Sequence, residues 1–474
     1  MAATPRSRLA ATTAAVALVG SAALSACGSD SDVVPSATHR PLSTSCAKVH
    51  CQGSIDGAAY QVELPSGTWN GTLLLYSHGY RQAGLDPVSK AQPNRKAQDA
   101  PDPATASALL AKGYALAGSA YASNGWATQD GVKADEALYA WFRDNVGRPL
   151  RVYAWGDSLG GLITEMLAEK HPDWVVGAAP LCGVLAGTNN NLDLALDVAY
   201  GVKTLLDPSL QLTGYASYDD AVAAFRHAFD AVYHATTDTT NGIPKILALA
   251  ALVDAPKQTA TYDGHDLPSL IGSYVEAIAT ALGYGTYDRW EIEQRVGGNP
   301  STNVGVDYRK RFDANERSLL DTFGTGKADQ LIGALQDGQR VSADPAARTK
   351  ADALGNPTGR IERPTITLHT EADPLVIVPN EAVFLQRVNR AKDRTGDLLQ
   401  LFTQAPHEFT APAPYGAGHC NFTTQENVAV ISLLDLWVRG AQYPATAQVR
   451  AAFAGDKGYD PDYVAPAWPV DLDR

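Results

Sequence analysis

Short apolar runs alternate with stretches of helical spacing along two parts of this chain. The pattern predicts strands at residues 55–63, 72–77, 114–120, 152–155 and 175–180. Apolar residues at helical spacing predict helices at 104–112, at 132–146 and from Leu159 onward. Alternation of strands with helices favours a mainly parallel sheet that is covered by helices on both faces.

The alternation stops between residues 187 and 359. Helical patterns dominate this stretch, with candidates near 218–234, 266–282 and 326–336. It resumes with a strand at 365–369, a helix at about 379–392, a strand at 398–402 and a helix after Thr423, where Thr423 and Glu426 match a capping box. We therefore expect one α/β core, formed by residues 46–186 and 360–474, and a mostly helical insertion at 187–359.

The N-terminus matches an export signal. Arg6 and Arg8 precede an apolar stretch that ends in Leu-Ser-Ala-Cys at 24–27. These four residues resemble the lipobox of bacterial lipoproteins, which implies that residues 1–26 are removed and that Cys27 carries a lipid. Residues 27–45 then form a flexible tether. The expected location is the bacterial cell surface, with anchorage in the membrane; a secreted soluble protein and a membrane-spanning helix are the alternatives.

Composition narrows the possible functions. The 474 residues are 45% hydrophobic and 19% charged, enough to bury a full core, and the net charge of −13 disfavours binding to nucleic acid. Four cysteines follow Cys27, an even number in an exported chain. Cys46 and Cys51 can close a small loop, which leaves Cys182 for Cys420, and the other two connectivities stay open. No cysteine or histidine cluster has zinc spacing.

The strongest chemical signal is Gly-Asp-Ser-Leu-Gly at residues 156–160, between an expected strand and an expected helix. A serine hydroxyl becomes a good nucleophile when a base takes its proton and a sharp turn projects it from the sheet. Gly156 and Gly160 leave room for such a turn, because a side chain at either position would collide with a neighbouring element. Ser158 is therefore the expected nucleophile.

From this motif onward the chain resembles the α/β-hydrolase family. The resemblance implies a mainly parallel sheet with helices on both faces and a helical cap inserted after the sixth strand. It also implies the order nucleophile, acid, histidine. Residues 365–375 match the segment of strand followed by acid, with Asp373 as the acid and Glu371 as the alternative. Residues 416–422 match the histidine loop, with His419 preferred over its rival His407.

The resemblance assigns a role to each residue. His419 takes the Ser158 proton and returns it to the leaving group, while Asp373 orients and stabilises the imidazole. The backbone N–H groups of Leu159 and Tyr80 are the expected oxyanion donors. His78, beside Tyr80, is expected to be a packed turn residue.

A second resemblance concerns the cysteines. In tannase and feruloyl-esterase enzymes a disulfide ties together the neighbours of the serine and the histidine. Cys182 and Cys420 are placed to do the same here, although Asp157 rather than a cysteine precedes Ser158.

The expected activity is the hydrolysis of small carboxylic esters, without a metal or cofactor. The insertion is rich in tyrosine, and caps in this family shape an apolar or aromatic pocket, which favours an acyl or aryl ester. A peptidase or acyltransferase of the same fold is an alternative. So is a surface binding protein that has lost activity. The Gly-Gly-Pro-Gly oxyanion loop of many aminopeptidase relatives is absent after Ser77, which disfavours the peptidase.

Overall fold

A computed structural model describes residues 49–87, 90–391, 397–404 and 417–472, all of them within one compact unit, Leu42–Arg474. Its strands are β1 (His50–Ile55), β2 (Ala58–Glu63), β3 (Thr72–Ser77), β4 (Ala115–Ser119), β5 (Arg151–Asp157), β6 (Val175–Leu181), β7 (Thr365–Thr370), β8 (Leu398–Thr403) and β9 (Tyr459–Asp460). They form a single sheet in the order β1-β2-β4-β3-β5-β6-β7-β8-β9. The pairs from β4 to β8 are parallel, and only the outer pairs β1–β2, β2–β4 and β8–β9 are antiparallel.

The helices of the α/β core come before β6 or after β7 in the sequence. They are α1 (Pro103–Ala111), α2 (Thr128–Asn145), α3 (Leu159–Lys170), α12 (Pro379–Arg390), α13 (Thr424–Gly440) and α14 (Thr446–Ala452). Thr423 caps α13, and its reciprocal bonds with Glu426 complete the expected capping box. Together with the strand order, these elements are the expected α/β-hydrolase fold.

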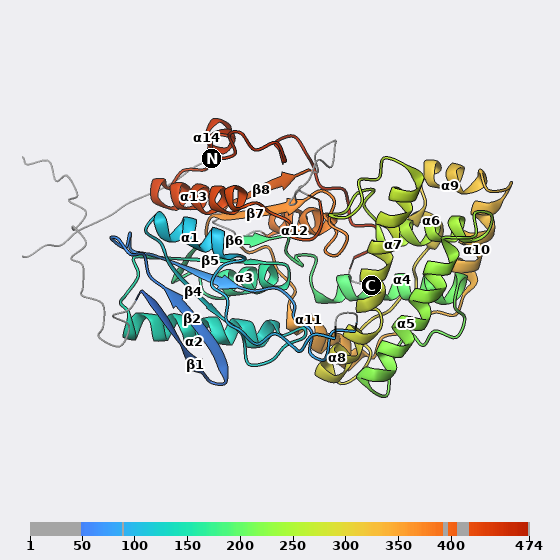
Figure 1. The fold of residues 1–474 in the computed structure, drawn as a ribbon, viewed down its shortest axis with the longest axis horizontal. Helices are drawn as coiled ribbons and strands as arrows, with labels where there is room; N and C mark the ends of the chain where they lie inside the picture. The colour runs from blue at the N-terminus through green and yellow to red at the C-terminus, as the bar shows by residue number, and fades with distance from the viewer. Residues whose placement is uncertain (1–48, 88–89, 392–396, 405–416, 473–474) are drawn as a thin grey trace, which may run out of the picture. The chain divides into compact units, whose positions relative to one another are not determined.

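Both faces of the sheet are buried, which explains the uninterrupted apolar run in β3. Leu73 and Leu75 pack in a cluster with residues of α2 and α3, whereas Leu74 packs in another cluster with residues of α1 and α13. Successive side chains of a strand point to opposite faces, so a strand covered twice must be apolar at every position. Figure 1 shows these helices on the two sides of the sheet.

The first expected strand is wrong in extent. The sequence indicated one strand over residues 55–63, but the structure has the antiparallel hairpin β1–β2 with its turn at Asp56 and Gly57. Both turn residues have positive φ, 48° and 83°. An Asp-Gly pair favours such a two-residue hairpin turn, and this signal marks the boundary that the apolar pattern does not.

The stretch between β6 and β7, the sixth and seventh strands, is helical as expected. It contains α4 (Thr188–Leu205), α5 (Tyr218–Ala235), α6 (Gly242–Val253), α7 (Leu267–Tyr284), α8 (Tyr287–Val296), the 3₁₀ helix η2 (Tyr308–Arg311), α9 (Ala314–Asp321), α10 (Lys327–Asp337) and α11 (Pro345–Leu354). The sequence indicated only α5, α7 and α10. α4 and α6 are buried on nearly every side, so they lack the one-sided apolar pattern by which a helix is found.

The helical insertion has its own core. Many of its buried side chains, among them Tyr200, Phe225, Leu249 and Ile278, form one cluster that does not include residues of the sheet. In the described part of the chain, no helix is both long and apolar enough to cross a membrane.

Candidate active site

Ser158 stands at the turn between β5 and α3, with φ 60° and ψ −123°. A positive φ is strained for a residue other than glycine, and such backbone strain is typical of functional turns. The flanking glycines permit the turn: a Cβ on Gly156 would lie 2.3 Å from the Ser77 carbonyl oxygen, and one on Gly160 would lie 1.9 Å from it. The turn therefore has the geometry of a nucleophile elbow at the carboxyl end of a central strand.

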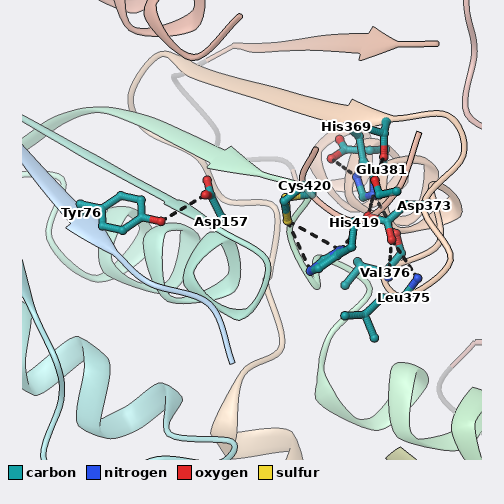
Figure 2. The surroundings of a disulfide bond; sticks show 12 residues. Tyr76, Asp157, His369, Asp373, Leu375, Val376, Glu381, His419 and Cys420 are labelled. Atoms are coloured by element: carbon teal, nitrogen blue, oxygen red, sulfur yellow. Dashed lines mark hydrogen bonds and ion pairs between the residues drawn. A yellow bond between two sulfur atoms is a disulfide. The ribbon is translucent and has the colours of Figure 1, made fainter. Parts of the chain in front are cut away.

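Asp373 and His419 lie next to each other, as the sequence predicted. His419 Nδ1 lies 2.8 Å from Asp373 Oδ2, and Asp373 Oδ1 accepts hydrogen bonds from the backbone N–H groups of Leu375 and Val376 at 2.8 and 2.9 Å. Burial would raise the pKa of Asp373, but the charges and hydrogen bonds of His419 and His369 outweigh it and lower the pKa to about 2. Asp373 is therefore ionised and fixed in direction (Figure 2).

Glu371, the alternative acid, lies elsewhere. Burial and the nearby Asp460 carboxylate raise its pKa to about 7, and one of its carboxyl oxygens is buried with no hydrogen-bond partner in the part of the chain that the structure describes. The rival histidine, His407, lies outside the described residues. Asp373 and His419 are thus the carboxylate and imidazole that the described structure brings together.

Backbone contacts hold the loops of Asp373 and His419 against each other. Gly418 N–H donates to the Ala372 carbonyl at 2.8 Å, and the Thr370 hydroxyl donates to the Gly418 carbonyl at 2.8 Å. These contacts lie immediately beside the two side chains. Because they fix both backbones, the spacing between carboxylate and imidazole does not depend on the side chains alone.

The predicted disulfide between Cys182 and Cys420 is present, with the two Cα atoms 5.4 Å apart. Cys420 Sγ lies 3.3 Å from His419 Nε2 and 3.6 Å from Nδ1. Near-equal distances to both nitrogens place the sulfur against the ring rather than along the lone pair of either one. The disulfide therefore supports the imidazole directly (Figure 2).

The same disulfide also links the loop of His419 to the segment that lies beside Ser158. Cys182 directly follows β6, and its neighbour Leu181 accepts a hydrogen bond from Ser158 N–H at 2.9 Å. Ser158 and His419 thus stand at the same end of the sheet, on segments joined through one bridge. Between these two described residues no hydrogen bond is formed, which is common before substrate binds.

The turn after β3 lies close to Ser158. A Cβ on Gly79 would be 3.1 Å from Ser158 Cβ, so only glycine fits this approach without displacement. Among the described residues, the backbone N–H groups of Tyr80 and Leu159 donate to no other group. His78 is buried, stacks on Tyr121 with ring centres 3.9 Å apart, and has its pKa lowered to about 3, chiefly by burial. It is the packed turn residue that the sequence predicted.

A pocket opens over Ser158 between the sheet and the helical insertion. The sheet side contributes Tyr80, Trp126 and Leu159, and the insertion contributes Leu192, Ala195, Ala281 and Tyr284. The polar atoms of two aromatic walls are already engaged: Tyr80 OH donates to Asp288 at 2.7 Å and Trp126 Nε1 donates to Thr188 at 3.0 Å. Apart from Ser158 and Asn191, the lining is therefore apolar or aromatic.

Asp157 directly precedes Ser158, at the position where the tannase and feruloyl-esterase enzymes have a cysteine. Its Oδ2 accepts a hydrogen bond from Tyr76 OH at 3.1 Å, while Oδ1 is buried without a partner among the described residues. Burial raises the pKa of Asp157 to about 7, against the lowering effect of Tyr76 and His419. The carboxyl group next to Ser158 is thus about half protonated at neutral pH.

Two further residues of this region, His369 and Glu381, were not predicted from the sequence. His369 lies in the fully buried strand β7 and contacts both Asp373 and Glu381. A histidine inside a doubly covered strand needs polar partners, and this requirement was the available signal. Within the described residues, no three His, Cys, Asp or Glu side chains are arranged to hold a metal ion. Cys27 and Cys46 lie outside those residues, so the lipid attachment and the Cys46–Cys51 pairing stay predictions.

No family model matches the chain. The chain is 24% identical over 448 residues to an o-phthalyl amidase of Xanthobacter agilis, a match that covers 82% of this chain and 87% of that protein. This relative is a hydrolase by name.

Solved structures with similar folds are distant. Feruloyl esterase B of Aspergillus oryzae is 14% identical, with a TM-score of 0.39, over 83% of this chain and 80% of that one. Proline iminopeptidase of Mycobacterium smegmatis is 14% identical, with a TM-score of 0.34, over 83% and 100%. At these values the fold assignment depends on the strand order and the elbow.

Proposed function

We propose that this protein is an exported serine hydrolase that cleaves small carboxylic esters through a covalent acyl-enzyme on Ser158. The observation that carries the proposal is the ionised Asp373, 2.8 Å from His419, at the same end of the sheet as a serine in a strained elbow. An acid, a base and a nucleophile in this chain order are the components of acyl transfer.

The reaction follows from these components. His419 Nε2 takes the proton of Ser158 as Oγ attacks the carbonyl carbon, and Asp373 stabilises the resulting imidazolium. The Leu159 and Tyr80 N–H groups, which donate to no other described residue, donate to the oxyanion. His419 then protonates the leaving alcohol. Water, activated by the same histidine, adds to the acyl-enzyme and releases the acid and Ser158.

The pocket favours a compact, uncharged acyl or aryl group. Its walls are apolar and aromatic. Asp288, behind Tyr80, has its pKa raised to about 8 by burial, so this carboxyl group adds little charge at neutral pH. Apolar groups gain free energy by leaving water for such a surface, whereas a charged group would lose hydration without a partner.

Amide hydrolysis is the second candidate. The observation that favours it is the similarity to an enzyme named an o-phthalyl amidase over most of both chains. The same groups would serve, because His419 can protonate an amine leaving group as it does an alcohol. The poorer leaving group makes amides the harder substrates.

A matched substrate panel separates the candidates. Acetyl, butyryl and benzoyl groups would each be offered as the p-nitrophenyl ester and as the p-nitroanilide, to the wild type and to Ser158→Ala. Turnover of the esters by the wild type alone supports the proposal. Turnover of anilides without esters would replace it by the amidase. If neither is cleaved and Ser158 is unreactive, the protein is a binding protein that has lost activity.

Export and anchoring complete the proposal. The signal at residues 1–26 and the lipobox-like Cys27 support attachment to the bacterial membrane through lipid. Cys27→Ser should release the protein into the medium when it is expressed with its own signal in a bacterium that processes lipoproteins. Unchanged retention of this variant with the membrane would contradict lipid attachment.

A further inference from the structure

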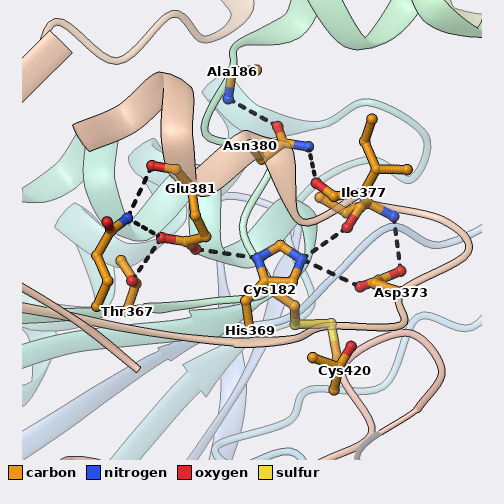
Figure 3. A network of polar contacts seen from close by, with 12 residues as sticks. Cys182, Ala186, Thr367, His369, Asp373, Ile377, Asn380, Glu381 and Cys420 are labelled. Carbon is orange, nitrogen blue, oxygen red and sulfur yellow. Dashed lines mark hydrogen bonds and ion pairs between the residues drawn. A yellow bond between two sulfur atoms is a disulfide. The ribbon is translucent and has the colours of Figure 1, made fainter. Parts of the chain in front are cut away.

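A second histidine, His369, contacts Asp373, the proposed catalytic acid. His369, on β7, is completely buried, and its Nε2 lies 3.5 Å from Asp373 Oδ2, the same oxygen that His419 approaches. On the other side of the ring, Nδ1 lies 3.2 Å from Glu381 Oε1. Figure 3 shows the ring between the two carboxylates.

The partners of the ring define its protonation. Nε2 lies 2.8 Å from the Val376 carbonyl oxygen, which can only accept a hydrogen bond, so Nε2 carries a proton. Glu381 in turn is surrounded by donors: Thr367 OH and Gln400 Nε2 both lie 2.7 Å from its Oε2. Two donors on Oε2 favour the carboxylate form of Glu381, and a carboxylate Oε1 can only accept, so Nδ1 donates to it. His369 is then an imidazolium.

We infer that His369 is a positioning residue: its buried positive charge keeps Asp373 ionised and aimed, and limits how strongly Asp373 favours the protonated form of His419. The inference depends on the proposed function, because it concerns the same triad. Two imidazole rings share one carboxylate oxygen, and a positive charge on the inner ring opposes a positive charge on the outer one. His419 therefore stays unprotonated, and able to act as a base, to lower pH than it would beside an isolated aspartate.

The electrostatic setting of His369 agrees with this role. Burial alone would lower the pKa of His369, but the hydrogen bonds and charges of Asp373 and Glu381 outweigh it and raise the pKa to about 10. From α3, Glu165 faces Glu381, and its pKa is raised well above the ordinary value by burial and by Glu169 and Glu381, which favours its neutral form. Asp157 acts on His419 from the elbow.

The test compares the pH dependence of kcat/KM for p-nitrophenyl acetate in the wild type, His369→Gln and Thr367→Val. Glutamine keeps a donor but removes the charge. Valine removes a hydrogen bond to Glu381 from the same network and leaves the charge in place. We expect the acidic limb of His369→Gln to move upward by about one pH unit, and that of Thr367→Val to stay at the wild-type position. Asp157 is common to all three proteins, so the difference reports on His369.

An unchanged acidic limb in a folded, active His369→Gln would overturn the inference. So would a shift of equal size in Thr367→Val, since a merely structural role would produce it. A direct measurement on the wild type does not depend on whether the variant folds. With ¹⁵N-labelled histidine, one imidazole should retain protons on both nitrogens at pH 8.5, where ordinary histidines are neutral. Absence of that signal also overturns the inference.

Failure of the proposed function looks different. In that case the wild type would neither hydrolyse the ester nor react with a fluorophosphonate. The imidazolium signal of His369 would then decide the charge state alone: its presence would leave the Glu381–His369–Asp373 contacts as a charged structural network without a catalytic role, which rejects the inference as stated.

Discussion

Cys420 is disulfide-bonded to Cys182 and at the same time touches the imidazole of its neighbour His419, with Sγ 3.3 Å from Nε2. The bridge spans 238 residues of sequence and joins the histidine loop to the end of the strand beside the nucleophile strand. A covalent tie across so long a segment removes many ways for the base to move away from Ser158.

Loss of this bridge should therefore reduce catalysis. Cys182→Ala, or reduction of the wild type with dithiothreitol, should lower kcat by about 100-fold, because displacement of the base by about 1 Å has this effect. The measurement is hydrolysis of p-nitrophenyl acetate at saturating substrate. Cys51→Ala is the matched control, since Cys51 is buried on β1, away from the site. Equal kcat values for Cys182→Ala and the wild type would contradict a positioning role for the disulfide.

The acid can be identified by a pair of substitutions. Asp373→Asn should lower kcat by about 10³- to 10⁴-fold, because an amide cannot stabilise the imidazolium and favours the wrong tautomer. Glu371→Gln, two residues earlier, should leave kcat within about twofold of the wild type, because its carboxyl group lies near Asp460 and not near His419. If Glu371→Gln were the more damaging change, the assignment of the acid would be wrong.

Asp157 should make stability depend on pH. Its pKa is raised to about 7 in the folded protein, chiefly by burial, against about 3.9 in an unfolded chain. As pH rises between these values the unfolded chain releases the proton first, so the free energy of unfolding falls. Asp157→Asn removes this contribution and should be more stable than the wild type at pH 8 by on the order of 2–4 kcal/mol.

The check is urea unfolding of both proteins at pH 4 and pH 8. Other buried carboxyl groups with raised pKa, such as Asp135, remain in both proteins, so only the difference between them reports on Asp157. A difference in unfolding free energy that does not change between the two pH values would contradict the protonated state of Asp157.

The pocket should select substrates by size. Ala281→Leu adds three carbon atoms to the wall of the pocket contributed by α7. We expect kcat/KM for p-nitrophenyl benzoate to fall at least about tenfold more than for the acetate, because overpacking costs about 1–3 kcal/mol. Ala223→Leu, on an exposed position of α5, is the control and should change neither substrate. Equal losses for benzoate and acetate would show that this pocket does not hold the acyl group.

Much of the site could be predicted from the sequence because its signals are local. Ser158 sits in a five-residue motif between a strand and a helix, and both flanking glycines prove necessary for the close approach of Ser77. Asp373 and His419 follow strands in the order that the α/β-hydrolase resemblance implies. The pairing of Cys182 with Cys420 was one of three possible connectivities. It was favoured by the small loop that Cys46 and Cys51 can close and by its place beside the serine and the histidine.

The rest depends on contacts between distant segments. In the sequence, His369 resembles any other strand residue. Its partners become visible only in the structure, where β7 is covered on both sides and the ring lies between Asp373 and Glu381. α4 and α6 lack a one-sided apolar pattern, because each is buried on nearly every side in the folded chain. The hairpin β1–β2 was the avoidable error, since the Asp56-Gly57 pair was visible in the sequence.

The central claim is that His419 activates Ser158, and a fluorophosphonate probe tests it most directly. The probe reacts covalently with an activated serine. Peptide mass spectrometry of the labelled protein should find it on Ser158, and labelling should be lost in Ser158→Ala and slowed at least about 100-fold in His419→Gln. An unlabelled wild type, or labelling that persists in Ser158→Ala, would contradict the account.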